Sequence, residues 1–423
     1  MGIKHRADSG FREFRVLSQI SFGLTEKCFE MPYVSYPRPL AAMMKKHLYI
    51  LLSFVICSQS NGQNFDKLVE HFRNNNFVGF EVTPRDSINE NSLYKSKDFN
   101  VSISKNPINF KVDTLVLKNP YYTDDFDDWD ENYINFPKSF SVIYDENLIS
   151  LFGNGKFLCH NLKDYSRNKQ LENELNSKKF KYHWVIDGKL YAKSKSILFS
   201  GLHQWNGAKW ESAEIKIPVD EQSILLSDDK FIIYRKCSGE FGGTIYFFDR
   251  QSKETFFTES TCANTVIKKN GQYQILAHLG HMMGTSEIKV IDDPKKLAKA
   301  KSNQLRIKQG SLGYQDKSNE YSKELDLSGI QLFSTFEIEN RRLFLANFNE
   351  STFLAEIDGK EIQIVNPLFN NDKYTHDPIT KTYGTYTLIN MDHYGTALDR
   401  EVSVMIIKDD KITLIDWNEN HSR

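Results

Sequence analysis

The chain is poor in cysteine and proline, with five Cys and 11 Pro among its 423 residues. The cysteines never form a Cys-x-x-Cys pair, so the usual spacing of a zinc site is missing. Scarce proline excludes a proline-rich linker. A Gly-x-Ser-x-Gly elbow, a phosphate-cradling glycine loop and a Ser-x-Asp-x-Gly-x-Thr-Trp box are also missing. These absences leave no signature for a cofactor, and we expect none.

A strong excess of charge of either sign is missing too. The net charge is −1, and removal of residues 1–62 leaves 46 basic residues against 51 acidic ones. A mildly acidic chain without basic blocks is not built to neutralise phosphates, so nucleic acid is not an expected partner. Beyond residue 62 no run is long and apolar enough to cross a bilayer, and we expect no membrane span in the mature chain.

Residues 44–62 have the three parts of a bacterial secretory signal peptide. A basic start is followed by a ten-residue apolar run and a small, polar end. A run of this length is about half of what a membrane span needs. We therefore expect translation to start at Met43 or Met44 and cleavage to fall near Gly62 or Gln63.

This signal predicts a periplasmic or extracellular protein of a Gram-negative bacterium. Residues 1–43 are then upstream sequence or disordered. The alternative is a lipoprotein anchored through Cys57, which would make the protein an envelope-anchored assembly component. A lipobox has a small residue before the cysteine, and Ile56 is large. We expect cleavage rather than lipidation.

Three cysteines follow the signal segment: Cys159, Cys237 and Cys262. An oxidising compartment permits a disulfide. Cys237 ends one expected strand and Cys262 precedes another, so these two form the candidate bridge. The alternative is three buried free thiols, since a sequence does not determine connectivity.

A short tag recurs along the chain, in which a turn pair is followed by Lys and an apolar, β-rich run. Asn-Gly and Asp-Gly pairs between alternating runs are strong hairpin signals, because both residues tolerate the positive φ of a type I′ turn. The tag therefore predicts repeated antiparallel hairpins. It occurs at residues 155–157, 187–190, 207–210, 229–231, 358–360 and 410–412.

The early repeat units begin about 41 residues apart, with three or four short expected strands each. Such a period indicates a β-propeller, in which each blade is a four-stranded sheet. We predict an all-β fold: a propeller of six or seven blades over residues 136–423, after a β-rich extension with a short helix at 63–135. The alternative is one or more β-sandwiches. Residues 295–328 break the pattern, as an insertion or a degraded blade.

Two segments resemble known propeller families. Residues 202–211 contain a Trp-x-Gly-x-x-Trp hairpin, which is similar to one in bacterial secreted propellers. Residues 242–252 resemble the double glycine and Tyr-x-x-Asp strand of kelch-like blades, although a Trp near Phe256 is missing. The two segments cover 21 residues. The resemblance implies a secreted bacterial β-propeller with kelch-like blades, and it implies no activity.

Three residues are candidate ligand contacts. His278 and His281 stand near two Met in a glycine-flanked segment, a set that suits copper. Positions three apart on a strand face opposite ways, however, so we expect a loop with ligand contacts and no metal site. Trp205 lies beside a turn and is a candidate for stacking on a sugar; the alternative is packing between strands.

Carboxylates do not identify a catalytic site. The acidic loop at 124–131 departs from a calcium-binding loop because Tyr133 occupies the glycine position. Asp377, Asp392 and Asp399 are possible acid–base partners, but their spacing along the chain does not predict their separation in space. The catalytic residues stay unassigned.

The fold alone does not determine activity. We expect a binding module for a ligand, a glycan or a protein partner. The alternative is an enzyme that acts on carbohydrate or peptide through carboxylates at the channel mouth. Three or more inward-facing Asp, Glu, Arg or His side chains there would favour the enzyme, and an aromatic rim without such a cluster would favour the binding module.

Overall fold

The computed structural model describes the chain in ten stretches, all inside the unit formed by Ser60–Arg423. The predicted signal peptide, Cys57 and the acidic loop lie outside them. No helix in these stretches has the length and apolarity that a bilayer crossing requires. The described residues are 65–74, 92–122, 137–194, 201–215, 224–280, 284–301, 320–368, 375, 377–391 and 404–417.

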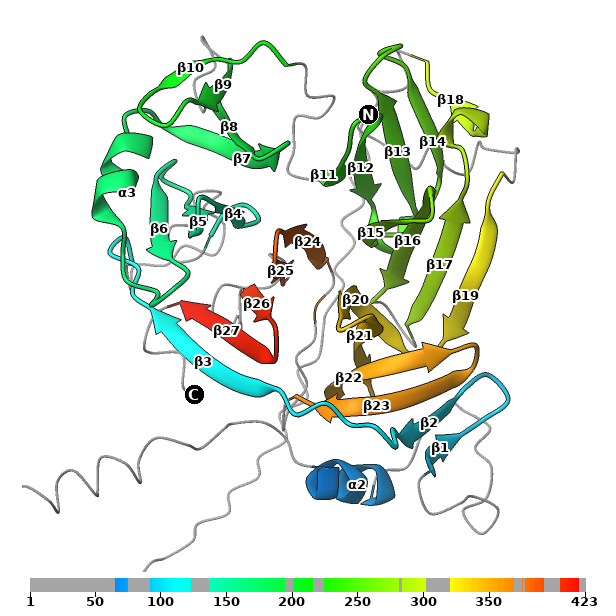
Figure 1. Cartoon of the computed structure of the whole chain (residues 1–423). Coiled ribbons are helices and arrows are strands. Elements are labelled where there is room, and N and C mark those ends of the chain that lie inside the picture. The colour runs from blue at the N-terminus through cyan, green and yellow to red at the C-terminus, as the bar shows by residue number, and fades with distance from the viewer. Residues whose placement is uncertain are drawn as a thin grey trace, which may run out of the picture. The chain divides into compact units, whose positions relative to one another are not determined.

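The strands in these stretches form six sheets, which stand as blades around one axis (Figure 1). Blade 1 has β4 (Val142–Tyr144), β5 (Asn147–Leu151) and β6 (Phe157–Asn161), and blade 2 has β7 (Phe180–Ile186), β8 (Lys189–Ser194), β9 (Leu202–Trp205) and β10 (Trp210–Ser212). Blade 3 has β11 (Ile224–Ser227), β12 (Phe231–Cys237), β13 (Gly243–Asp249) and β14 (Thr255–Glu259), and blade 4 has β15 (Ala263–Lys269), β16 (Gln272–Leu279), β17 (Thr285–Ile291) and β19 (Ser322–Ser328). Blade 5 has β20 (Gln331–Ile338), β21 (Arg341–Phe348), β22 (Ser351–Asp358) and β23 (Glu361–Pro367), and blade 6 has β24 (Ile379–Tyr383), β25 (Tyr386–Asn390), β26 (Val404–Lys408) and β27 (Lys411–Trp417).

This arrangement confirms the predicted all-β propeller, with six blades among the described residues. A sandwich packs two sheets face to face, whereas here each sheet has two neighbours in a ring. Short helices join some strands: α3 (Lys169–Leu175) connects blades 1 and 2, and η2 (Gly239–Phe241) connects β12 and β13. Asn168 caps α3, because its Oδ1 accepts a hydrogen bond from the Leu171 amide at 3.1 Å.

The hairpin turns follow from the local sequence. Asp187 and Gly188 join β7 to β8 with φ angles of 52° and 71°, the left-handed region that this residue pair tolerates. In the β9–β10 hairpin, Trp205 lies directly opposite Trp210. The recurring tag therefore marks real hairpins.

Each blade buries its two faces against its neighbours. Six hydrophobic clusters fill the six interfaces between consecutive blades, including the one between blade 6 and blade 1. At that last interface Trp417 of β27 meets Phe152, with ring centroids 5.2 Å apart. Apolar packing thus closes the ring.

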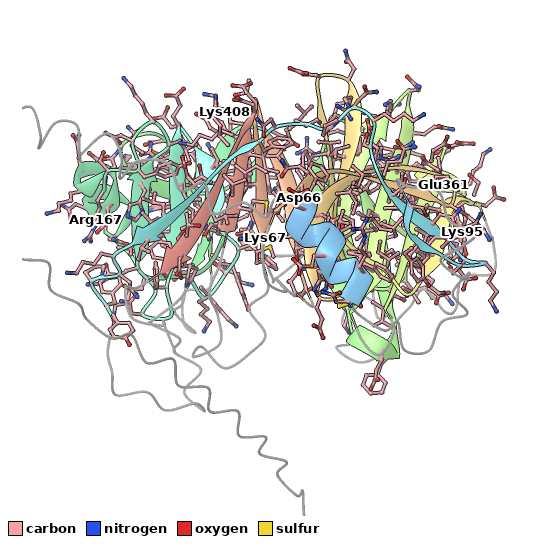
Figure 2. All side chains as sticks on the ribbon, turned by 90° about the horizontal axis from the view of Figure 1, so that it is seen from below. Asp66, Lys67, Lys95, Arg167, Glu361 and Lys408 are labelled. Atoms are coloured by element: carbon pink, nitrogen blue, oxygen red, sulfur yellow. A yellow bond between two sulfur atoms is a disulfide. The ribbon has the colours of Figure 1, made fainter. Side chains whose placement is uncertain are left out.

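The N-terminal extension lies along the outside of blades 5 and 6. There β2 (Asn100–Ile103) pairs in parallel with β23, and β3 (Lys111–Leu117) pairs in parallel with β27. We call β2, β3 and the residues between them the strap. Figure 2 shows β3 crossing β27 at the edge of the ring. Val112 and Leu117 of the strap are buried in the blade 5–6 and blade 6–1 interfaces.

The rest of the extension covers blade 5. Here β1 (Ser92–Lys95) pairs antiparallel with β2, and α2 (Phe65–Asn74) buries Leu68 and Phe72 in the cluster between blades 4 and 5. The ring of Phe72 lies 5.9 Å from that of Phe348 in β21. The short helix that the sequence predicts therefore packs on the propeller.

The irregular region predicted at residues 295–328 ends in the fourth strand of blade 4, β19. Near its start, η3 (Pro294–Lys296) leads into β18 (Ala298–Lys299), which joins the outer edge of blade 3 beside β14. Then β19 pairs with β17. Blade 4 is thus a complete four-stranded sheet, and the insertion is the segment between β17 and β19.

Candidate functional site

A cavity of about 760 Å³ lies on the axis of the ring, and its wall includes residues from the first strand of every blade. It also includes the first hairpin turns of blades 1, 2 and 6, at residues 145–146, 187–188 and 384–385. We call this end of the channel the hairpin mouth. Its volume is in the range that small-molecule sites occupy.

One cation, Lys381 of β24, lies in the cavity wall. Its Nζ donates a hydrogen bond to the carbonyl oxygen of Val185 in β7 at 3.3 Å. It also lies 5.7 Å from the centroid of the Tyr383 ring. Lys381 therefore reaches from blade 6 to blade 2, past the inner strand of blade 1. Among the described residues it forms no ion pair.

Burial lowers the pKa of Lys381 to about 8, because the charged ammonium loses hydration in the channel. Nearby His183 does not titrate in this range. Its imidazole is buried, which lowers its pKa to about 4, and its Nε2 donates to the Ile149 carbonyl oxygen at 3.1 Å. Burial also raises the pKa of Tyr383. Lys381 is thus the group in this cluster that changes charge near neutral pH.

A pH dependence of stability follows from this lysine. Between about pH 8 and its ordinary value of 10.5, the unfolded chain holds the Lys381 proton and the folded chain releases it. The free energy of unfolding of the wild type therefore rises with pH in this window. We expect the variant Lys381→Met to be more stable than the wild type at pH 7, and this advantage to shrink by pH 10. Urea unfolding at both pH values measures it, with Lys189→Met as the exposed control.

Four carboxylates also line the mouth: Asp145, Glu146, Asp187 and Glu337. Asp187 pairs with Arg250 at 2.5 Å, and Glu337 pairs with Lys269 at 2.6 Å. Asp145 and Glu146 form the β4–β5 turn and are exposed. They form no ion pair among the described residues.

The side chain of Lys408 interacts electrostatically with Glu146, but it donates its hydrogen bond to Tyr386 Oη at 3.0 Å. The mouth therefore carries two carboxylates without a salt-bridge partner in the described part of the chain.

The predicted ligand residues do not meet in this channel. Trp205 is 3% exposed and packs on Trp210, with centroids 5.4 Å apart, in the interface of blades 1 and 2. This packing uses the ring faces that would stack on a sugar. His278 lies in blade 4, and His281 lies outside the described residues.

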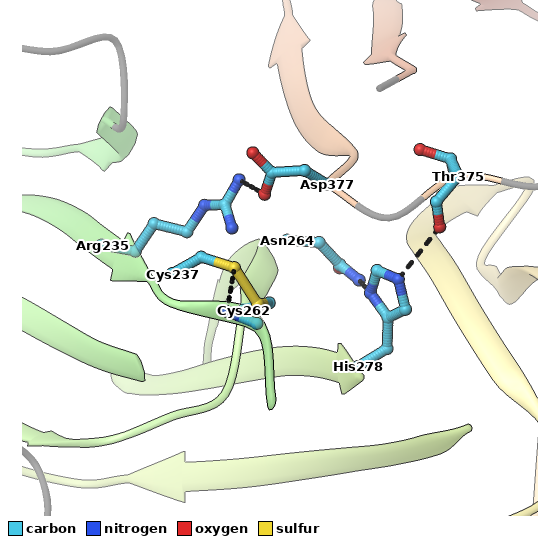
Figure 3. Close-up of a disulfide and its surroundings, with 8 residues drawn as sticks. Arg235, Cys237, Cys262, Asn264, His278, Thr375 and Asp377 are labelled. Carbon is cyan, nitrogen blue, oxygen red and sulfur yellow. Dashed lines mark hydrogen bonds and ion pairs between the residues drawn. A yellow bond between two sulfur atoms is a disulfide. The ribbon is translucent and has the colours of Figure 1, made fainter. Parts of the chain in front are cut away.

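His278 is held inside the protein. It is 1% exposed; its Nδ1 accepts a hydrogen bond from Asn264 Nδ2 at 3.1 Å, and its Nε2 donates to the Thr375 carbonyl oxygen at 3.4 Å (Figure 3). Both ring nitrogens are therefore engaged. In the described residues no group of three His, Cys, Asp or Glu side chains is arranged to hold a metal.

A disulfide joins blades 3 and 4 near His278. Cys237 at the end of β12 is bonded to Cys262, which precedes β15 (Figure 3). Beside it, the buried Arg235 forms an ion pair with Asp377. Asp377 is thus engaged, while Asp392 and Asp399 lie outside the described residues. Cys159 is a buried free thiol.

We expect this disulfide to stabilise the fold measurably. The cysteines are 25 residues apart, and in the chain-entropy description a loop of that length contributes about 3 kcal/mol. The double variant Cys237→Ser, Cys262→Ser should lose this amount in urea unfolding. Reductant should lower the stability of the wild type to that of the variant and leave the variant unchanged. Equal stability of oxidised and reduced wild type would contradict the prediction.

No motif in the sequence marks Lys381, Asp145 or Glu146 as site residues. These residues are recognised as channel residues only once the structure places β24 and the β4–β5 turn next to the axis. The available signal is weak, because a lysine between two threonines is also typical of an exposed strand.

Comparisons with known proteins identify neither a family nor an activity for this chain. No protein-family model matches the chain, and no curated protein matches it. Among solved structures, the chain is similar to the tricorn protease, with 14% identity and a TM-score of 0.35 over 65% of this chain and 25% of the other. It therefore spans about a quarter of that protease.

Two further solved structures are similar at the same low level. BamB from Moraxella catarrhalis has 8% identity and a TM-score of 0.29, over 60% of this chain and 67% of the other. The β-propeller domain of the Trilobed protease from Pyrococcus furiosus has 14% identity and a TM-score of 0.31, over 66% and 86%. Likeness at this level carries no information on the activity of this chain.

Proposed function

We propose that this protein is a binding module that holds a small polar ligand in its central channel. The observation that supports this most is the cavity of about 760 Å³. Its wall includes every inner strand and Lys381, which has no ion-pair partner in the described part of the chain. Propellers are rigid rings, so such a cavity exists before the ligand arrives. A preformed, concave site with a few polar groups is typical of ligand binding.

A small polar ligand fits these walls. Trp205 and Trp210, the candidates for stacking on a sugar, pack on each other in a blade interface, and the aromatic side chains of the wall are Tyr144, Phe336, Tyr383 and Tyr386. The exposed hydroxyl groups of the wall belong to Thr382 and Thr385, whereas those of Thr265, Thr335 and Thr380 are buried and donate hydrogen bonds inside the protein. The second candidate is a protein partner that binds at the rim of the channel.

The carboxylates of the mouth are the feature that favours an enzyme. Hydrolysis by paired carboxylates needs one on each side of the scissile bond. Asp145 and Glu146 are neighbours in one turn and lie on the same side, while Asp187 and Glu337 are neutralised by ion pairs. Binding is therefore the better account of this set.

We also propose that the protein works outside the cytoplasm, in the periplasm or beyond, after cleavage of residues 44–62. The disulfide between Cys237 and Cys262 supports this, because structural disulfides persist in oxidising compartments. Mass spectrometry of the mature N-terminus tests it. A chain that begins at Gly62 or Gln63 is expected, and a lipid on Cys57 would instead make the protein an anchored assembly component.

A thermal-shift experiment with an occluded channel tests the binding role. Thr382 lies exposed in the cavity wall, and Thr382→Trp places an indole in the channel; Ser212→Trp adds the same group at the outer edge of blade 2. Panels of amino acids, short peptides, sugars and divalent cations should include a compound that stabilises the wild type and Ser212→Trp but not Thr382→Trp. At a hundredfold excess over Kd, the gain is about 2.7 kcal/mol. Stabilisation that survives Thr382→Trp would contradict the proposal.

A further inference from the structure

Charges of opposite sign that have no ion-pair partner among the described residues lie at different depths of the channel. The cation is Lys381, three residues before the turn at Gly384 that forms part of the mouth. At the rise of a strand this is about 10 Å. The unpaired carboxylates, Asp145 and Glu146, lie at the mouth itself. A ligand that enters from the mouth therefore meets negative charge first and positive charge deeper in.

Lys381 has no ion-pair partner among the described residues. An ammonium has three N–H donors, and here one long hydrogen bond to the Val185 carbonyl at 3.3 Å is its contact with an oxygen. A carboxylate in the channel would supply both the missing charge and further acceptors. Charge-assisted hydrogen bonds of this kind are about twice as strong as neutral ones.

The mouth restricts which anions reach this lysine. Asp145 and Glu146 repel a ligand with several negative charges, such as a phosphate dianion, and attract a cationic group. A purely cationic ligand would leave Lys381 unpaired and meet repulsion there. The complementary ligand carries one carboxylate and, on its other end, an ammonium or guanidinium group.

We propose that the channel binds a short peptide of about three residues, with its terminal carboxylate on Lys381 Nζ and its terminal ammonium at Asp145 and Glu146. An extended tripeptide spans about 10 Å, which is the length of strand between Lys381 and the turn at Gly384. The exposed hydroxyl groups of Thr382 and Thr385 can bond to the peptide groups between the two ends. This inference rests on the proposed function, since it names the ligand class of the same channel.

Blocked tripeptides test each end separately. Trialanine is the probe, and N-acetyl-trialanine and trialanine amide lack the ammonium and the carboxylate. Isothermal titration of the wild type at pH 7 should show trialanine binding at least tenfold more tightly than trialanine amide, and several-fold more tightly than N-acetyl-trialanine. Equal affinities for trialanine and its amide would overturn the proposal, and so would an absence of trialanine binding at millimolar concentration.

Substitutions identify the groups that contact each end. Lys381→Met should weaken trialanine at least tenfold and leave trialanine amide unchanged, whereas Lys381→Arg should retain most of the affinity. The double variant Asp145→Asn, Glu146→Gln should weaken trialanine and leave N-acetyl-trialanine unchanged. Lys189→Met and Asp409→Asn are exposed controls away from the cavity wall. Melting curves establish that each variant is folded.

The variants distinguish a wrong peptide assignment from a channel that binds no ligand. If Thr382→Trp abolishes the binding of some other compound while Lys381→Met does not affect it, the channel is a ligand site and the peptide assignment is wrong. If trialanine binds equally to the wild type and to Thr382→Trp, its site lies elsewhere and the peptide assignment is wrong. The channel fails as a ligand site if every compound that stabilises the wild type also stabilises Thr382→Trp.

Discussion

Replacing Trp417 by Ala should lower the free energy of unfolding by about 3–5 kcal/mol. Trp417 is fully buried at the end of β27, where its ring lies 5.2 Å from Phe152 and 5.7 Å from His160. Truncation leaves a cavity at the interface where the last blade meets the first. Urea unfolding followed by circular dichroism measures the loss.

Trp417→Phe is the matched control for this prediction. The indole Nε1 is buried and has no hydrogen-bond partner in the described part of the protein. Phenylalanine therefore removes some volume without breaking a hydrogen bond, and we expect less than half of the loss that alanine causes. An alanine variant as stable as the wild type would contradict the packing of blade 6 on blade 1.

Replacing Leu117 by Ala should cost about 2–4 kcal/mol, the usual range for a buried leucine. Leu117 lies opposite Trp417 in the parallel β3–β27 pair and is 5% exposed. The strap would lose its contact with the interface that closes the ring. The midpoint of urea unfolding should fall, with an unchanged slope if the rest of the fold is intact.

The same strand provides the control for the strap. Val116, the preceding residue, is 43% exposed, and Val116→Ala should change stability by no more than about 0.5 kcal/mol. If both variants lose the same small amount, the strap contributes little to stability. If Leu117→Ala alone is destabilised, the extension is a structural part of the propeller.

Local chemistry made the propeller predictable. Turn pairs such as Asp187 and Gly188 specify hairpins because their backbones accept positive φ angles, and this requirement is independent of the rest of the chain. Repetition of such hairpins at one period then implies repeated sheets.

Pairings between distant segments were not predictable. Strand β3 of the strap pairs with β27, which lies about 300 residues later in the chain. The alternating pattern of β3 does not predict this pairing, because any sheet edge offers the same hydrogen bonds. Strand β24, at Ile379–Tyr383, was also not predicted. The polar residues of an inner strand lack the apolar run that marks the other strands.

Among the candidate site residues, the sequence could not separate packing from ligand contact. Trp205 and His278 were singled out for their chemistry, and the structure buries both side chains. Large aromatic and imidazole groups pack in blade interfaces and also contact ligands. Residue type alone therefore does not show which of these two roles a side chain has. Lys381 had no distinguishing neighbour in the sequence, and its environment comes from β7 and β24 together.

The sequence by itself determined the all-β class and the hairpin repeat, because turn preference and strand alternation act between residues that are close along the chain. Tertiary structure alone decided the ring of six blades, the strap on blades 5 and 6, and the charges that face the channel. The ring, the strap and the channel charges all depend on which surfaces from distant parts of the chain pack together. This packing leaves Lys381 partly desolvated in the channel, without an ion-pair partner in the described chain.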